Sequence, residues 1–319
     1  MLSGGSPGIA LHRCATLLAG ATVMLIFVGG LVTSTGSGLS VPDWPLSFGQ
    51  LFPPMEGGVF YEHGHRMVAA AVGLLTVLLA IWILLVEPRP VVRRLAGAAV
   101  VTVIGQGLLG GLTVLLQLPT AISVAHACVA QAFLCITVAL AVLTTPGWDA
   151  PAVTCDQERP RLATLSTLTI AAVYGQLLLG AVTRHTGAGL AIPDFPLAFG
   201  RIIPPLDLPG VAIHFAHRLG AVVVTFMIGW TTGRILRGGV QTPPLVRFAI
   251  LAMALVIAQV TLGALVVWTS KAILPTTAHV AVGAAILATT VALALHAHRL
   301  GTGRRADVGG ILGSSRAQA

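Results

Sequence analysis

Four histidines, two in each half of the chain, have the type and spacing that suit metal binding. They lie inside four strongly apolar segments, at one depth near what we expect to be the outer membrane surface: His65, His126, His217 and His279. A polar side chain inside a membrane is costly unless it has a partner. One buried histidine is usually a satisfied core residue, but four at matched depth favour coordination of a metal. Two neutral imidazoles that face each other across a helical bundle suit a bis-histidine haem. Zinc is less favoured, because no cysteine or acid completes a tetrahedral set in either half.

An acidic residue distinguishes the two halves. Glu62 lies three residues before His65, hence on the same helix face, whereas the equivalent residue of the second half is His214. The Glu62 carboxylate either accepts a hydrogen bond from a neighbour or faces the edge of a first haem as a proton-handling or charge-stabilising group. Under the second interpretation, the first site carries out chemistry and the second holds a permanent cofactor.

Several arginines are candidate contacts for haem propionates. Arg66 and Arg218 directly follow two of the histidines, and a guanidinium there would either bind a carboxylate or extend to the membrane interface. Arg184 and Arg201 occur only in the second half and are further candidates. The sequence assigns no role to His63, His185 or His214.

Glycines and aspartates near these residues have structural interpretations. Gly110, Gly180 and Gly263 each follow a glutamine by four residues, a pattern that predicts close helix approach with interhelical hydrogen bonds. Asp43 and Asp194 lie in turn-rich loops and are expected to satisfy backbone groups there.

The composition predicts the elements that position these residues. Of 319 residues, 55% are hydrophobic and only 9% are charged, whereas a soluble domain has about 25% charged residues. This composition indicates an integral membrane protein, and the dispersed positive charge argues against a nucleic-acid partner. The first apolar stretch is expected to be a retained helix. Eight stretches are long enough to span a bilayer, near 11–33, 60–86, 95–116, 122–144, 162–183, 211–236, 248–269 and 276–297.

Basic residues between these stretches predict the topology. Most lie in alternate connections and at the two ends of the chain, which the positive-inside rule places in the cytoplasm with both termini. The long loops near 34–59 and 185–210 then face outward, as do the histidine sites. The basic set is Arg13, Arg89, Arg93, Arg94, Arg159, Arg161, Arg234, Arg237, Arg247, Arg299, Arg304 and Arg305.

The two outer loops repeat one sequence, TGSGLSVPDWPLSFGQLFPP from Thr35 and TGAGLAIPDFPLAFGRIIPP from Thr186. The match continues into EHGHR and HFAHR, and such a repeat indicates duplicated architecture. We therefore predict an all-α integral membrane protein with eight transmembrane helices, arranged as two tandem four-helix bundles related by a pseudo-twofold axis along the membrane normal. Residues 11–144 form the first unit, 145–161 a cytoplasmic linker, 162–298 the second unit and 299–319 a disordered cytoplasmic tail.

With these residues in place, the chain resembles the haem A synthase family over about residues 10–300. The resemblance is carried by the TGSGLSVPDWP loop, the Glu62-x-x-His65-Arg66 motif, the LPTA segment before His126, the His217-Arg218 pair and His279. Many family members have a cysteine pair in an outer loop, and this sequence has none there, so a role for such a disulfide cannot apply.

The resemblance implies an activity and a division of labour. His65 and His126 would flank the substrate haem O with Glu62 at the catalytic position, and His217 and His279 would ligate a haem b cofactor. The reaction would oxidise the C8 methyl group of haem O to a formyl group by successive hydroxylations, giving haem A for cytochrome oxidase. The implied partners are haem O synthase and an unidentified electron donor. The implied location is the cell (inner) membrane. The sequence does not determine whether the protein forms a homo-oligomer. The alternatives are a dihaem b-type electron-transfer protein and a haem transporter.

Overall fold

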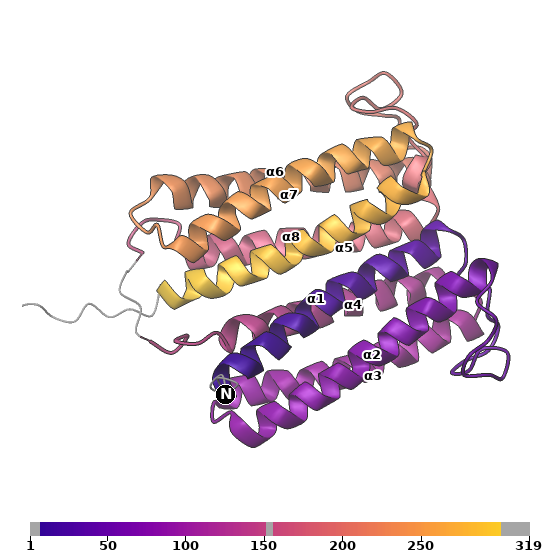
Figure 1. The fold of residues 1–319 in the computed structure, drawn as a ribbon. Coiled ribbons are helices and arrows are strands. Elements are labelled where there is room, and N and C mark those ends of the chain that lie inside the picture. The colour runs from indigo at the N-terminus through magenta and orange to yellow at the C-terminus, as the bar shows by residue number, and fades with distance from the viewer. Residues whose placement is uncertain (1–6, 151–155, 301–319) are drawn as a thin grey trace, which may run out of the picture.

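The structure, a computed structural model, describes residues 7–150 and 156–300, and within them the chain is helical (Figure 1). Eight long helices and one short 3₁₀ helix, η1 (Ala188–Leu190), make up this part of the chain. The eight are α1 (Pro7–Ser34), α2 (Gly57–Val86), α3 (Pro90–Leu115), α4 (Thr120–Leu143), α5 (Leu162–His185), α6 (Pro209–Arg237), α7 (Pro243–Trp268) and α8 (Ile273–Leu300). The prediction of an all-α chain with eight long helices is confirmed. The predicted disordered tail lies almost entirely outside the described residues.

Helix boundaries differ from the predicted ones mainly at the starts of helices. We expected helices from about residues 95 and 248, but α3 begins at Pro90 and α7 at Pro243. Proline suits the first helical turn, because its fixed φ is helical and its missing N–H would have no intrahelical partner there. Hydropathy alone places these starts too late, since the first turns contain the arginines that lie at the membrane surface.

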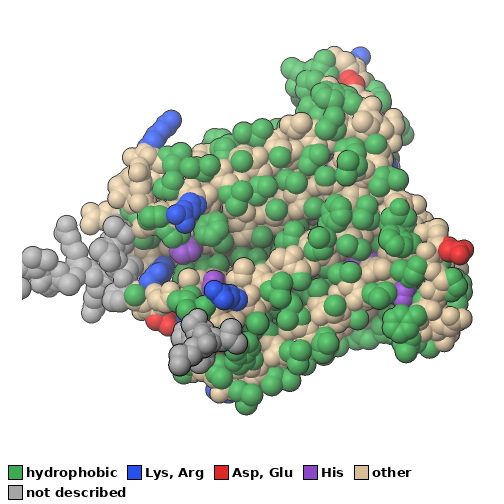
Figure 2. Space-filling model, in the orientation of Figure 1, with side chains coloured by type: hydrophobic (Ala, Val, Ile, Leu, Met, Phe, Trp, Pro, Cys, Tyr) green, Lys and Arg blue, Asp and Glu red, His purple; other side chains and the backbone are tan. Residues whose placement is uncertain are grey.

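All eight helices are long and apolar enough to cross a membrane. Figure 2 shows one face of the molecule, on which hydrophobic side chains cover the middle of the helices and charged side chains lie towards their two ends. This distribution is that of a multi-pass membrane protein, whose middle band faces lipid.

Consecutive helices pack into two groups of four (Figure 1). In the first group α1 contacts α2 and α4, and α3 contacts α2 and α4; in the second, α5 contacts α6 and α8, and α7 contacts α6 and α8. The groups meet through α1 and α4 on one side and α5 and α8 on the other. The pseudo-twofold relation between them stays a prediction.

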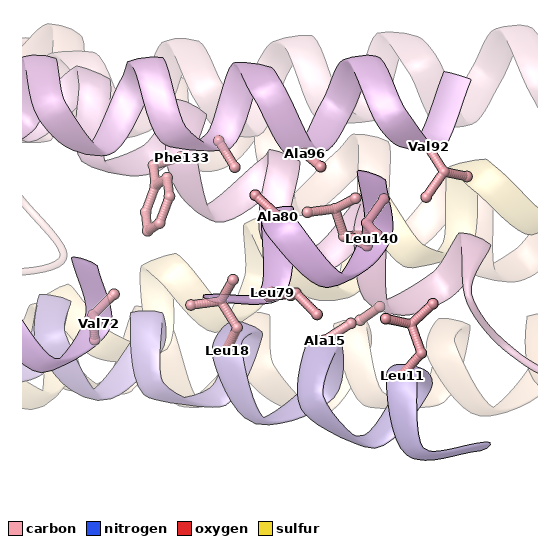
Figure 3. Close-up of a cluster of buried hydrophobic side chains, with 13 residues drawn as sticks. Leu11, Ala15, Leu18, Val72, Leu79, Ala80, Val92, Ala96, Phe133 and Leu140 are labelled. Atoms are coloured by element: carbon pink, nitrogen blue, oxygen red, sulfur yellow. The ribbon is translucent and has the colours of Figure 1, made fainter. Parts of the chain in front are cut away.

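The interior of the first group is built from small and branched apolar side chains. Figure 3 shows Leu18 of α1, Leu79 of α2, Ala96 of α3 and Leu140 of α4 in one buried cluster. Small residues let helix backbones approach closely, which matters in a membrane because lipid competes for apolar contacts. The cluster holds the four helices at fixed spacing, and therefore fixes the side chains that they carry towards the ends.

Polar contacts join the two groups near the ends of the helices that carry the long loops, here called the loop end. Arg184 of α5 donates 2.9 Å hydrogen bonds to the Gly30 carbonyl and to the Ser34 hydroxyl of α1. Thr277 of α8 donates to the same Ser34 hydroxyl at 3.0 Å. Arg184, a candidate propionate contact in the sequence, thus links the two halves in the structure.

Candidate functional site

The four histidines share one packing arrangement at the loop end. Each lies within the first three turns of an even-numbered helix, and its ring lies over a glycine of the preceding helix. A Cβ atom added to that glycine would lie 3.1 or 3.2 Å from the imidazole Cε1 atom, closer than side chains normally pack. The pairs are His65 with Gly29, His126 with Gly110, His217 with Gly180 and His279 with Gly263. The glycines therefore create the space that the imidazoles occupy.

The sequence interpretation identified three of these glycines and missed Gly29. The 151-residue register of the repeat places Gly29 opposite Gly180, and that signal would have found it. It was missed because Leu25, and not glutamine, precedes Gly29 by four residues.

The predicted interhelical hydrogen bonds of the glutamines are present. Gln106 donates to the His126 carbonyl at 2.9 Å and Gln176 to the His217 carbonyl at 2.8 Å. The same amide nitrogens lie 3.4 Å from His126 Nε2 and 3.0 Å from His217 Nδ1. Each glutamine therefore restrains the backbone and the ring of one histidine.

The second histidine pair has a separation that fits one iron between two imidazoles. The ring centroids of His217 and His279 are 6.4 Å apart, with the ring planes at 74°. A metal–imidazole bond of about 2 Å on each side, plus the ring radii, places the centroids of two axial ligands roughly 6 Å apart. The described residues contain no group of three or more histidine, cysteine, aspartate or glutamate side chains suited to a metal ion. The arrangement fits haem, whose porphyrin supplies the other iron ligands.

Glu62 is buried close to the first pair. The residue is 4% exposed; Oε2 accepts a 2.8 Å hydrogen bond from the backbone N–H of Val41, and Oε1 accepts one of 2.7 Å from Arg66. The structure therefore shows the hydrogen-bonded state that was one of our two interpretations of Glu62. The guanidinium and the backbone N–H hold the two carboxylate oxygens in fixed positions. The catalytic role of Glu62 stays a prediction.

In the second half, the equivalent backbone N–H is also a hydrogen-bond donor, but its acceptor is a histidine. His214 is 5% exposed, and its Nδ1 atom accepts a 3.2 Å hydrogen bond from the N–H of Ile192, the residue equivalent to Val41. The same loop conformation is thus held by a negative group in one half and by an imidazole in the other. The difference between Glu62 and His214 is one of charge and proton capacity, and the surrounding backbone is shared.

Arg66 and Arg218 hold the long loops against their helices. Arg66 donates to the carbonyls of Asp43 and Leu46 at 2.7 and 2.8 Å. Arg218 donates to the equivalent carbonyls of Asp194 and Leu197 at 2.7 and 2.8 Å. The sequence interpretation did not foresee this role, because no local pattern shows which distant carbonyls a guanidinium will reach. Contact of either arginine with a propionate stays a prediction.

Asp43 and Asp194 satisfy backbone groups in the loops, as predicted. Asp43 accepts from the N–H groups of Phe48 and Gly49 at 2.7 and 2.8 Å, and Asp194 makes the same two bonds to Phe199 and Gly200. In each loop these N–H groups hold the pKa of the aspartate below its ordinary value. Both loops therefore have an ionised, internally hydrogen-bonded aspartate at neutral pH.

The remaining residues singled out from the sequence have different surroundings. Arg201 is an exposed loop residue whose backbone pairs with Ala198. The backbone carbonyl of His185 accepts a 3.3 Å hydrogen bond from Thr120. His63 is 6% exposed, and its Nδ1 atom lies 2.8 Å from the hydroxyl of Ser47. The second half has Phe215 and Ala198 at the positions of His63 and Ser47, so this polar pair is specific to the first half.

The fold and the site together define a class, that of multi-pass helical membrane proteins with four partly buried histidines at one end of the helices. The chain matches the cytochrome oxidase assembly protein family (COX15-CtaA) over residues 12–59 and 56–291, and it belongs to that family. It is 37% identical to the heme A synthase of Symbiobacterium thermophilum, over 79% of this chain and 84% of that protein. It is 32% identical to the heme A synthase of Shouchella clausii, over 83% and 89% of the two chains. A third heme A synthase, from Alkalihalophilus pseudofirmus, is 31% identical over 79% and 85%.

Proposed function

We infer that this protein is an oxidoreductase that converts haem O to haem A. The observation that carries this conclusion is the match to heme A synthases, which spans about four fifths of the chain. The matched region includes Glu62 and all four site histidines. The reaction converts the C8 methyl group to a hydroxymethyl group and then to a gem-diol, which loses water to leave the formyl group.

We propose that the first pair, His65 and His126, binds the substrate haem O, and that His217 and His279 bind haem b as the resident cofactor. The 6.4 Å ring separation of the second pair supports the assignment of a bis-histidine haem. Such a haem supplies one-electron redox chemistry. The first pair is assigned to the substrate because Glu62, a group able to handle a proton, lies beside it and is absent from the second half.

Glu62 is the proposed catalytic residue. Its carboxylate is held in place by the Val41 N–H and by Arg66, so it can stabilise positive charge or accept a proton at the substrate without first having to be ordered. Arg66 in turn fixes the loop that covers this end of α2.

The localisation follows from the charge distribution, which supports a cell-membrane protein with both termini in the cytoplasm. Arg89, Arg93 and Arg94 lie between α2 and the first turns of α3, and Arg234 and Arg237 lie at the end of α6, all at the end of the molecule opposite the long loops. By the positive-inside rule, we propose that this end is cytoplasmic and that the histidine sites lie near the extracytoplasmic side.

The experiment that tests the function is expression of the full chain together with a supply of haem O, followed by identification of the extracted haems by mass. We expect haem A in addition to haem B. Recovery of only haem B and unmodified haem O would contradict the enzyme assignment. It would favour the two alternatives, a dihaem electron-transfer protein or a haem transporter.

A further inference from the structure

The four histidines differ in what restrains them. A glutamine lies four residues before the contacting glycine in three of the odd-numbered helices: Gln106 in α3, Gln176 in α5 and Gln259 in α7. In α1 the equivalent residue is Leu25. His65 is therefore the one histidine of the four whose contacting glycine is not preceded by a glutamine at this position.

Each glutamine places its side-chain amide nitrogen beside its histidine. The side-chain nitrogens lie 3.4, 3.0 and 3.4 Å from ring nitrogens of His126, His217 and His279. The three Oε1 atoms are buried and have no hydrogen-bond partner among the described residues. In Gln106 and Gln176 the same nitrogen also donates to the backbone carbonyl of the histidine, at 2.9 and 2.8 Å. Outer-shell contacts of this kind orient a metal-binding histidine.

His65 has no such glutamine beside it. The Nδ1 atoms of His65 and His126 are both buried and unpartnered within the described part of the chain, but His126 is held through its backbone and ring by Gln106. Leu25 is packed against the buried apolar cluster of the first group, as is Val68 one turn after His65. An apolar side chain cannot donate the hydrogen bond that Gln106 and Gln176 supply, so the His65 ring is positioned by packing over Gly29.

We propose that His65 is the exchangeable axial ligand of the first site, and that Leu25 is the residue that makes it so. The proposal rests on the function inferred above, in which the first site must release a product after each turnover and the second keeps its haem. Loss of an outer-shell partner typically weakens a metal site by about 10- to 100-fold. Leucine in place of glutamine therefore weakens the iron–His65 bond at the site that has to exchange its haem. At the second site, which keeps its haem, Gln176 restrains the equivalent histidine, His217.

The test is the rate of haem release from the purified full chain, loaded with haem O and haem B, into an excess of apomyoglobin. Mass analysis of the released haem assigns each kinetic phase to a site. For the wild-type chain we expect fast release of haem O and slow release of haem B. Leu25→Gln should slow the fast phase by about 10- to 100-fold. Leu25→Met, which adds no N–H donor, is the matched control and should leave it unchanged. Gln176→Leu should accelerate the slow phase by a similar factor.

Equal haem O release from Leu25→Gln and Leu25→Met would overturn the proposal, as would an unchanged slow phase in Gln176→Leu. The Gln176→Leu measurement also decides the question if Leu25→Gln does not fold. These failures differ from failure of the proposed function. A chain that makes haem A with release rates insensitive to these substitutions refutes only the role of Leu25, whereas a chain that binds no haem refutes the histidine assignment itself.

Discussion

The carboxylate of Glu62 and the backbone N–H of Val41 are joined by a buried 2.8 Å hydrogen bond, which ties the second turn of α2 to the long loop before it. In the second half the N–H of Ile192 makes the equivalent bond to His214. A structural role for this position is therefore met by either residue, and only the carboxylate adds a negative charge. Substitutions that keep the hydrogen bond and remove the charge can separate the two roles.

Glu62→Gln should retain haem binding and lose haem A formation. The amide oxygen can still accept from Val41, so the loop stays anchored, but the side chain no longer takes up a proton. A general acid–base group typically contributes about 10²- to 10⁴-fold to a rate, and we expect a loss in that range. The measurement is haem A per bound haem O by mass. Glu62→His, which installs the residue of the second half, is the control for anchoring and should be equally inactive. Wild-type turnover in either variant would remove Glu62 from the catalytic role.

The histidine pairs should be separable by the haem that each one holds. His217→Ala or His279→Ala should abolish the haem b spectrum, and His65→Ala or His126→Ala should abolish retention of haem O while haem b stays bound. The control is His12→Ala, because the ring of His12 contacts the Ala141 carbonyl at the opposite end of the helices. Loss of haem b in His65→Ala alone would show that the two sites are assigned in the wrong order.

The glycine contacts predict a steric effect on haem affinity. Gly180→Ala places a methyl group 3.1 Å from His217 Cε1, and relief of such overpacking typically costs about 1–3 kcal/mol. We expect haem b affinity to fall by about tenfold or more, since 1.4 kcal/mol corresponds to one factor of ten. Gly175→Ala lies in the same helix, and its added methyl group meets no described atom within 4 Å. A haem titration in which the two variants bind equally well would show that the His217 ring does not depend on this space.

The features that were predicted from the sequence are those that depend on local composition or on the repeat. Eight helices follow from hydropathy, and the turn role of Asp43 follows from its place among turn-forming residues. Gly110 was recognised as a packing site because the glutamine before it completes a pattern, and the same criterion missed Gly29. The glutamine pattern finds only glycines that have a glutamine four residues before them. The contacts show that Gly29 packs under His65 as Gly180 packs under His217, and only then does Leu25 stand out as the residue in place of the glutamine.

The features that were not predicted depend on long-range contacts of flexible side chains. Arg66 donates to the carbonyls of Asp43 and Leu46, which lie 23 and 20 residues earlier in the chain. Arg184 donates to a carbonyl of α1, in the other half of the chain. A long guanidinium can serve a ligand, a loop or the membrane interface. Which of these it serves depends on how the helices pack, and the sequence around the arginine does not encode that choice.

The loop aspartates predict a pH dependence confined to the long loops. Backbone N–H groups of Gly49 and Phe48 lower the pKa of Asp43 from its ordinary 3.8. Stabilisation from such a group is fully present above the pKa of the unfolded chain and is lost as the pH falls through the lower folded-state pKa. Amide protection factors of Phe48 and Gly49 should therefore be constant from neutral pH down to about pH 5 and decrease below about pH 4.

The loop of the second half provides an internal replicate, since Asp194 binds Phe199 and Gly200 in the same way. Asp43→Asn should remove the acid-dependent decrease in the first loop and leave that of the second loop intact. Protection in the first loop that still falls with acid in Asp43→Asn would mean that another group controls it.

The buried pair of Ser47 and His63 predicts strong coupling between two substitutions. Arg66 can only donate, and its nitrogen lies 3.4 Å from the Ser47 oxygen, so the hydroxyl proton is directed to His63 Nδ1, 2.8 Å away. The other ring nitrogen, Nε2, is buried and has no partner in the described structure. Ser47→Ala would leave both ring nitrogens unsatisfied, and each unsatisfied buried polar group typically costs about 1–3 kcal/mol.

The second half shows how this cost is avoided, because it combines Ala198 with Phe215 at the same two positions. We therefore expect Ser47→Ala to lower the thermal unfolding midpoint, and Ser47→Ala combined with His63→Phe to restore it, since the apolar pair leaves no polar atom unsatisfied. Unfolding of the wild type, both single variants and the double variant in one detergent forms a double-mutant cycle with an interaction energy of about 1–3 kcal/mol. Simple additivity would show that the 2.8 Å contact does not couple the two residues. A stable double variant that still makes haem A would assign the pair to stability, whereas a stable but inactive one would place His63 Nε2 among the groups that the reaction requires.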